Sequence, residues 1–322
     1  MSERPALRIG TRGSALALWQ TERVRRLLAD GGHPTERIEI RTTGDMVQDV
    51  PLARIGSAAL FTRQIDEALL SGRIDLGVHS LKDLPTVLPE GIVLAAVSER
   101  EDSSDALVGR GPIRWSELPR DATVATSSLR RKAQLLHARP DLRVSDLRGN
   151  VDTRLRKLDS AEGWSAILLA SAGLLRLDLG HRIGERLPAG VMLPAPGQGA
   201  LAVTARADDA RAIDAARTAV HHRPSALAVA AERAFLRRME GGCQVPVAAL
   251  AALETGDTLR LHGRVIALDG GRMAEGHLSG RIREVDDAEQ MGAALADRLI
   301  REGAGEILAE VRAGHAPSVT EP

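Results

Sequence analysis

The chain contains one cysteine, no tyrosine and few other aromatic residues, which make up 2% of its 322 residues. A single cysteine excludes an internal disulfide framework and any metal site built from several thiolates, and the sequence predicts no metal site. The longest apolar stretches, within residues 166–175, are far shorter than the roughly 20 residues that span a bilayer. The N-terminus also lacks the apolar core of a signal peptide. These absences predict a cytoplasmic protein with no membrane segment.

Net charge is absent too, because 43 basic residues balance 43 acidic ones. Without a net positive charge, and with few aromatic rings for stacking on bases, the chain lacks the usual features of a nucleic-acid binder. Lys82, Lys132 and Lys157 are the only lysines, so arginine supplies the other 40 of the 43 positive charges. The length and the hydrophobic share of 43% predict an ordered protein of two or three domains.

Short apolar runs alternate with amphipathic segments in the first two-thirds of the chain. Residues 6–10 and 74–78 read as strands, and segments such as 14–28 and 129–138 have helical spacing. Strands that alternate with helices are typical of parallel α/β sheets. Beyond residue 225 the pattern changes to a long helix, two strands and further helices, which predicts a separate α+β domain.

Three junctions between a predicted strand and a predicted helix carry arginine together with serine or asparagine. They read TRGS (11–14), SSLRR (127–131) and RGN (148–150). A helix N-terminus offers unpaired N–H groups, and a neighbouring guanidinium suits a carboxylate. Each junction alone is better explained by an ordinary N-cap beside a solvated arginine. The three together favour a ligand with several anionic groups, bound where the strands end.

Two further segments leave more than one interpretation open. In DLGVHSLKDLP (75–85), Lys82 and Asp83 follow a strand end, where alone they favour a surface ion pair over an acid–base pair. The sole cysteine, Cys243, follows two glycines in a loop after a helix. A lone cysteine is most often a small buried hydrophobe, whereas a loop thiol can be a nucleophile or an attachment point.

Seven stretches, in the same order as in the family, resemble the porphobilinogen deaminases, also called hydroxymethylbilane synthases. They are residues 7–20, 60–70, 75–85, 125–135, 147–159, 193–203 and 232–246. The chain beyond residue 246 resembles the family only loosely. One departure concerns residues 56–61, which read GSAALF where the family usually carries a Gly-Lys-Gly element. We therefore assign no binding residue to positions 56–60.

The resemblance implies an α/β fold in which two periplasmic-binding-protein-like domains enclose a cleft and a small C-terminal α+β domain follows. Segments near Arg100 and Ala195 would link the two larger domains. We expect domain 1 to comprise residues 1–99 with 199–219, domain 2 residues 100–198, and domain 3 residues 220–322.

The resemblance also implies a transferase of tetrapyrrole (haem) biosynthesis. Four porphobilinogen molecules would condense head to tail into hydroxymethylbilane with loss of ammonia. The product would grow on one dipyrromethane cofactor per chain, bound through a thioether to Cys243. The implied partner is porphobilinogen, with no nucleic acid and no membrane, and the family expectation is a monomer.

The roles of individual residues follow from the same resemblance. Asp83 would be the catalytic carboxylate that stabilises the cationic azafulvene left by loss of ammonia. The residues expected to bind the cofactor besides Cys243 are Ser80, Lys82, Ser128, Arg130 and Arg131. Those expected to bind substrate are Arg12, Ser14, Phe61, Arg148, Arg154, Arg176 and Gln198.

The main alternative is a non-enzymatic anion-binding protein of the periplasmic-binding type. Its fold would suit the pattern of strands and helices. The missing signal peptide and the loop around Cys243 argue against it.

Overall fold

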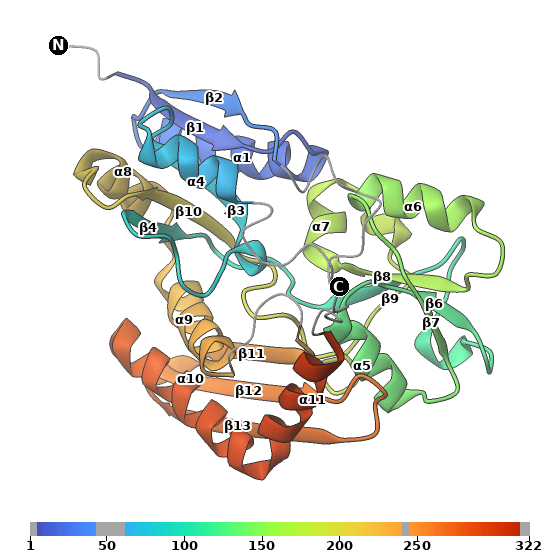
Figure 1. The fold of residues 1–322 in the computed structure, drawn as a ribbon. Helices are drawn as coiled ribbons and strands as arrows, with labels where there is room; N and C mark the ends of the chain where they lie inside the picture. Colours follow the sequence, from blue (N-terminus) through green and yellow to red (C-terminus); the bar gives the residue numbers. More distant parts are fainter. Residues whose placement is uncertain (1–4, 43–61, 240–244, 316–322) are drawn as a thin grey trace, which may run out of the picture.

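The computed structural model describes residues 5–42, 62–239 and 245–315, and three β-sheets organise them (Figure 1). In the first sheet the spatial order of strands is β2 (Thr35–Glu39), β1 (Leu7–Thr11), β3 (Leu76–Ser80), β10 (Leu201–Arg206) and β4 (Ile92–Val97). Strand β1 is parallel to β2 and β3, whereas β10 is antiparallel to both of its neighbours. Figure 1 shows β10, in yellow, inserted among strands coloured blue and cyan.

Helices cover both faces of the first sheet. Helices α1 (Ala15–Asp30) and α8 (Ala210–Val220) bury residues such as Val24 and Ala216 against Ile9 and Val203. Helix α4 (Arg63–Leu70) buries Ile65 in a second cluster of apolar side chains. Apolar residues at helical spacing thus meet strands that are apolar on both sides, as a sheet covered on both faces requires.

The second sheet repeats this arrangement. Its strands in spatial order are β7 (Arg143–Ser145), β6 (Thr123–Ala125), β8 (Ala166–Ala170), β5 (Asp105–Val108) and β9 (Glu185–Arg186). Its helices are α5 (Leu129–Ala138), α6 (Val151–Ser160) and α7 (Ser171–Arg176). Here β5 is the antiparallel strand next to the edge. The prediction of parallel sheets is therefore only partly right, because one strand in each sheet is antiparallel to its neighbours. These strands are β10 and β5, and each follows a segment in which the chain passes from one sheet to the other.

The chain crosses from the first sheet to the second between β4 and β5, and it returns between β9 and β10. The two crossings lie side by side, since the backbone N–H of Glu101 donates a 3.0 Å hydrogen bond to the carbonyl of Gly199. Buried Glu232, from the C-terminal part of the chain, contacts both crossings. It accepts hydrogen bonds from Arg100 Nη1 at 2.6 Å and from the N–H of Gly197 at 2.6 Å.

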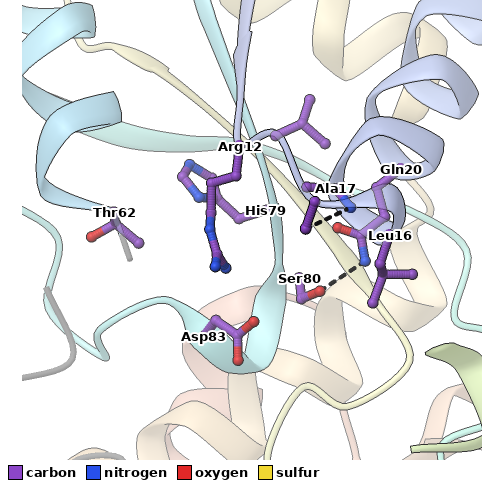
Figure 2. A pocket seen from close by; sticks show the side chains of 10 residues that line it. Arg12, Leu16, Ala17, Gln20, Thr62, His79, Ser80 and Asp83 are labelled. Carbon is purple, nitrogen blue, oxygen red and sulfur yellow. Dashed lines mark hydrogen bonds between the residues drawn. The ribbon is translucent and has the colours of Figure 1, made fainter. Parts of the chain in front are cut away.

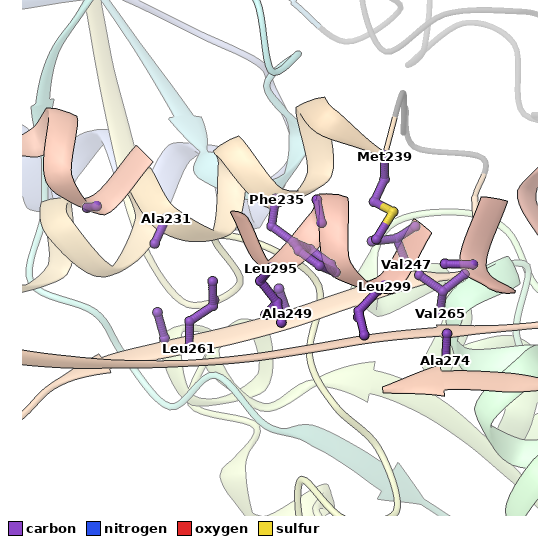
Figure 3. Packing of buried hydrophobic residues seen from close by; sticks show 14 of the residues in the cluster. Ala231, Phe235, Met239, Val247, Ala249, Leu261, Val265, Ala274, Leu295 and Leu299 are labelled. Atoms are coloured by element: carbon purple, nitrogen blue, oxygen red, sulfur yellow. The ribbon is translucent and has the colours of Figure 1, made fainter. Parts of the chain in front are cut away.

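The third sheet is antiparallel and consists of β11 (Val247–Leu253), β12 (Thr258–Ile266) and β13 (Met273–Arg281). Helices α9 (Arg223–Arg238) and α10 (Val285–Leu299) cover one face, and Figure 3 shows Phe235 of α9 packed among Leu261 and Leu295. A Cβ at Gly292 would lie 2.1 Å from the carbonyl oxygen of Ala231, so only glycine permits this close approach of α10 to α9.

The chain closes with a π-helical turn, η6 (Ile300–Ala304), and helix α11 (Gly305–His315). Short 3-10 turns stand at η2 (Leu81–Asp83), η3 (Trp115–Glu117), η4 (Gly180–Arg182) and η5 (Thr255–Asp257). The α+β domain predicted beyond residue 225 is confirmed, but β11 was not predicted. Its sequence, VAALAAL, is rich in alanine, which has a weak strand preference, and packing beneath α9 overrides that preference. None of the described helices combines the length and apolar character needed to cross a membrane.

Candidate active site

A pocket opens at the carboxyl ends of β1 and β3 (Figure 2). Its lining residues are Arg12, Ser14, Leu16, Ala17, Gln20, Thr62, Val78, His79, Ser80 and Asp83. The first sheet thus brings together four of the predicted site residues, which come from segments about 70 positions apart in the sequence. Parallel strands place their carboxyl ends at one edge of a sheet, which is why the junctions after β1 and β3 meet here.

The N-terminus of α1 forms one wall of this pocket. Ser14 has an extended backbone and caps the helix, since its Oγ accepts a 3.4 Å hydrogen bond from the N–H of Ala17. Figure 2 shows the side chain of Arg12 pointing toward Asp83. The positive end of the helix and a guanidinium therefore lie on the same side of the pocket, an arrangement that attracts anions.

Gln20 and His79 are among the pocket residues that the sequence analysis missed. Gln20, one and a half turns into α1, donates a 2.8 Å hydrogen bond from Nε2 to Ser80 Oγ. His79 is buried, and burial, with a smaller contribution from Arg12, lowers its pKa to about 4, so the ring is neutral at neutral pH. His79 stands directly before Ser80, within a segment already recognised, whereas only the helical face of α1 could have pointed to Gln20.

Lys82, Gln198 and Asp105 form a chain of polar contacts between the two α/β domains. Lys82 Nζ donates to Gln198 Oε1 at 3.1 Å, and Gln198 Nε2 donates to Asp105 Oδ1 at 3.0 Å. The pKa of the Lys82 ammonium is lowered to about 8, mainly by burial and also by Arg131 and Arg130, while Asp83 and Asp105 act in the opposite direction. Lys82 is therefore a cation close to its titration point at physiological pH.

Arg130 and Arg131, both expected at the ligand, are buried together with Asp105. Arg130 Nη1 lies 2.7 Å from Asp105 Oδ2, and Arg131 Nη2 lies 2.7 Å from Oδ1. Burial would raise the pKa of Asp105, but the two guanidinium charges outweigh it and hold that pKa well below its usual range. Ser128 caps α5 by accepting from the N–H of Arg131 at 3.4 Å. Arg130, Arg131 and Asp105 together carry two positive charges and one negative charge, so they form a net cationic cluster near the N-terminus of α5.

The second sheet adds two further cations. Arg154 donates from Nε to the carbonyl of Gly149 at 2.7 Å. Burial, then repulsion by Arg131 and Arg148, lowers the pKa of Arg154 to about 10, and Asp83 acts in the opposite direction. Asp83 of the first sheet's domain thus lies close enough to Arg154 of the second to act on its charge. Nη1 of Arg148 is buried and has no hydrogen-bond partner among the described residues.

Arg176 does not line this pocket. Arg176 is 9% exposed, donates from Nη2 to the carbonyl of Gly199 at 2.6 Å, and lies over the ring of Trp19 at 5.7 Å. It therefore ties α7 to α1 and to the second crossing. Cys243 and Phe61, like positions 56–60, lie outside the described residues.

The chain is an α/β protein with two mixed sheets, and its arginines lie near helix N-termini at the strand ends, an arrangement that suits a ligand with several anionic groups. A family model described as porphobilinogen deaminase, dipyrromethane cofactor binding domain, matches residues 7–214, and the model of the C-terminal domain of porphobilinogen deaminase matches residues 226–301. The chain belongs to the porphobilinogen deaminase family.

Individual relatives agree with the family models. The porphobilinogen deaminase of Moorella thermoacetica is 50% identical over 310 residues, covering 95% of this chain and 97% of its own. That of Desulforudis audaxviator is 52% identical over 309 residues, covering 95% and 98%. Among solved structures, a nutrient binding protein from Burkholderia cenocepacia bound to methionine is 16% identical with a TM-score of 0.43, covering 65% of this chain and 89% of its own.

Family membership confirms the resemblance found in the sequence. The chain is an enzyme of the transferase class that forms hydroxymethylbilane, and it contains the family's dipyrromethane cofactor-binding domain. The non-enzymatic alternative is not supported, because both family models and the relatives point to the same enzyme over almost the whole chain.

Proposed function

We propose that the pocket of Figure 2 is where this chain condenses porphobilinogen, with Asp83 as its catalytic carboxylate. The observation that carries this proposal is the position of Asp83. Among the described residues it is the one carboxylate that lines the pocket, and it stands opposite cations from both α/β domains. Loss of ammonia from the substrate leaves a positive charge, and a carboxylate already fixed at that point stabilises it without reorganisation.

The dipyrromethane cofactor suits the residues present. Each pyrrole unit derived from porphobilinogen carries an acetate and a propionate, so the cofactor presents four carboxylates. Among the residues that would meet the pyrrole unit added next, Arg148 has a buried Nη1 with no hydrogen-bond partner in the described part of the chain, which is a costly state unless a carboxylate arrives. When bound, the cofactor supplies the terminal pyrrole carbon to which the substrate is joined.

The chain's own residues have two roles, binding the cofactor and binding the incoming substrate. Ser80, Lys82, Ser128, Arg130 and Arg131 would hold the cofactor carboxylates, and Cys243 would anchor the cofactor covalently. The side chains that receive incoming substrate are Arg12, Ser14, Phe61, Arg148, Arg154, Arg176 and Gln198. Gln20 orients Ser80 by donating a 2.8 Å hydrogen bond to its Oγ. The Ser80 hydroxyl can then donate its own proton in a hydrogen bond to a ligand carboxylate.

The three sheets support the expected domain limits, which are residues 1–99 with 199–219, residues 100–198, and residues 220–322. The contact between the two crossings at Glu101 and Gly199 falls at the junction of the first two domains. The enzyme works as a cytoplasmic monomer on porphobilinogen, and nucleic acid is not a partner. Size-exclusion chromatography with light scattering tests the monomer, and a dimer mass would contradict it.

Intact-mass spectrometry of the purified protein, combined with an assay of porphobilinogen consumption, tests this function. The wild-type chain should carry a covalent addition with the mass of a dipyrromethane and should consume porphobilinogen. Cys243→Ser should lose both the addition and the activity. Active protein with an unmodified mass would contradict the anchor, and absence of porphobilinogen consumption by the modified protein would contradict the reaction.

A further inference from the structure

The outer face of the third sheet carries a group of histidine and glutamate side chains that the reaction does not use. His262 lies on β12, and Glu275 and His277 lie on β13. Strand alternation sends Leu261 and Val265 into the core beneath α9 and α10, so that His262 points to the opposite face. On β13, Glu275 and His277 are two positions apart and share that face.

The register of the two strands brings these side chains together. His262 is paired directly with His277, and Arg264 with Glu275, in the antiparallel ladder. The two imidazole centroids are 3.9 Å apart, and His262 Nε2 lies 2.5 Å from Glu275 Oε1. One potential ligand atom from each of the three residues lies within 4.8 Å of the other two.

We propose that His262, Glu275 and His277 bind a divalent transition-metal ion, with Zn²⁺ as the ion that best suits the ligands. Two imidazole nitrogens and one carboxylate oxygen form a ligand set that zinc accepts, with water in the remaining position. Metal–ligand bonds of about 2.0–2.2 Å place tetrahedral ligand atoms roughly 3.3–3.5 Å apart. The separations in the structure, from 2.5 Å between His262 Nε2 and Glu275 Oε1 to at most 4.8 Å among the three ligand atoms, bracket that spacing.

The surroundings of Glu275 resemble the outer shell of a metal site. Arg264 donates to Glu275 Oε1 from Nε at 2.9 Å and from Nη2 at 2.5 Å, and no hydrogen bond within the described residues occupies Oε2. Carboxylates that bind metals usually also accept hydrogen bonds from neighbouring protein groups, which orient them. The positive charge of Arg264 opposes a cation and reduces its affinity, but this charge is already paired with Glu275.

The site can be reached from solvent. When Nε2 of His262 binds the ion, its hydrogen bond with Glu275 Oε1 is broken and the single ring proton moves to Nδ1. His277 is exposed, which gives the ion a path of entry.

The ion would cross-link β12 and β13 beside the contact between the third sheet and the second domain. Arg264 also donates from Nη1 to Gln134 Oε1 on α5 at 2.9 Å, and His137 Nδ1 lies 2.8 Å from the carbonyl of Gly270. The proposed site is therefore structural and separate from the pocket of Figure 2, so its test does not depend on the reaction.

Titration of the purified holoenzyme with Zn²⁺ and Co²⁺ after treatment with a chelator tests the site. Isothermal titration should show one Zn²⁺ per chain, Zn²⁺ should raise the Tm, and Co²⁺ should give visible d–d absorption. His277→Gln, an exposed substitution, should weaken Zn²⁺ binding at least roughly tenfold and remove the Co²⁺ spectrum, and so should Glu275→Gln.

His181→Gln is the matched control, because His181 is an exposed histidine on η4 in the second domain. This variant should bind both metals as the wild type does. Absence of one-site binding in the wild-type protein would overturn the proposal. Unchanged affinity and an unchanged Co²⁺ spectrum in His277→Gln and Glu275→Gln would overturn it as well.

Discussion

Lys82 Nζ and Gln198 Oε1 are joined by a 3.1 Å hydrogen bond, which links the turn after β3 to the second crossing of the chain. The other end of the same amide donates to Asp105 and to the carbonyl of Ser103. Gln198 is fully buried, so a single side chain satisfies polar groups of the first domain, the second domain and the segment between them.

Replacing Gln198 by leucine should lower the free energy of unfolding by about 1–3 kcal/mol. The change leaves buried carbonyl and carboxylate oxygens short of a donor, which costs roughly this much per group. Urea unfolding followed by circular dichroism measures the effect. Gln290→Leu, at an exposed position of α10, is the control and should stay within about 0.5 kcal/mol of wild type. Equal stability of the two variants would contradict the role of Gln198.

Raising the pH through about 8 should weaken the binding of porphobilinogen. The pKa of Lys82 is lowered to about 8, so the ammonium loses its charge in this range and attracts carboxylates less. A profile of KM against pH should rise above pH 8 for the wild type. Lys82→Arg should flatten that rise, because guanidinium does not titrate there.

The same group changes stability in the opposite direction. The folded pKa of Lys82 is lower than the unfolded one, so between about pH 8 and 10 the unfolded chain binds more protons. The free energy of unfolding of the wild type should therefore increase, relative to that of Lys82→Arg, as the pH rises through this window. A parallel pH dependence of the two proteins would exclude the lowered pKa.

Arg148 and Arg131 should respond differently to the same substitution. Arg131→Gln breaks a buried ion pair with Asp105 and should cost about 3 kcal/mol of stability. Arg148→Gln removes a cation whose buried Nη1 lacks a hydrogen-bond partner in the described chain, so it should cost less than about 0.5 kcal/mol. It should instead raise KM about tenfold or more through a lost charge-assisted hydrogen bond. Thermal unfolding and steady-state kinetics on both variants separate the two effects, and a reversed pattern would refute the assignment.

Asp83→Asn should fold normally, keep the covalent cofactor and lose turnover by at least about 10²-fold. The amide preserves the shape of the side chain but removes the negative charge that the developing cation requires. Single-turnover consumption of porphobilinogen measures the chemical step, and intact mass verifies the cofactor. Activity within a few-fold of the wild type would remove Asp83 from the catalytic role.

Much of the site could be predicted where the signal is local. Ser14, Ser128 and Asn150 each cap the helix that follows, as both interpretations of the three junctions required. The pairing of Asp105 with Arg130 and Arg131 could not be predicted, because no local motif marks Asp105 and the contact depends on tertiary packing. The meeting of His262 with His277 likewise depends on strand register, which turns and burial fix only in the folded chain.

The insertion of β10 between β3 and β4 determines the order in which the domains can be completed during synthesis. Among the strands that the structure describes, β4 pairs with β10 alone, and one edge of β3 also pairs with β10. Both strands therefore have an exposed edge until residue 206 has left the ribosome. The second sheet is built from one continuous stretch ending at β9 and can close earlier. The N-terminal domain is therefore finished after the domain that follows it in the sequence, and its open edges during that interval are sites where a nascent chain can aggregate or be protected by a chaperone.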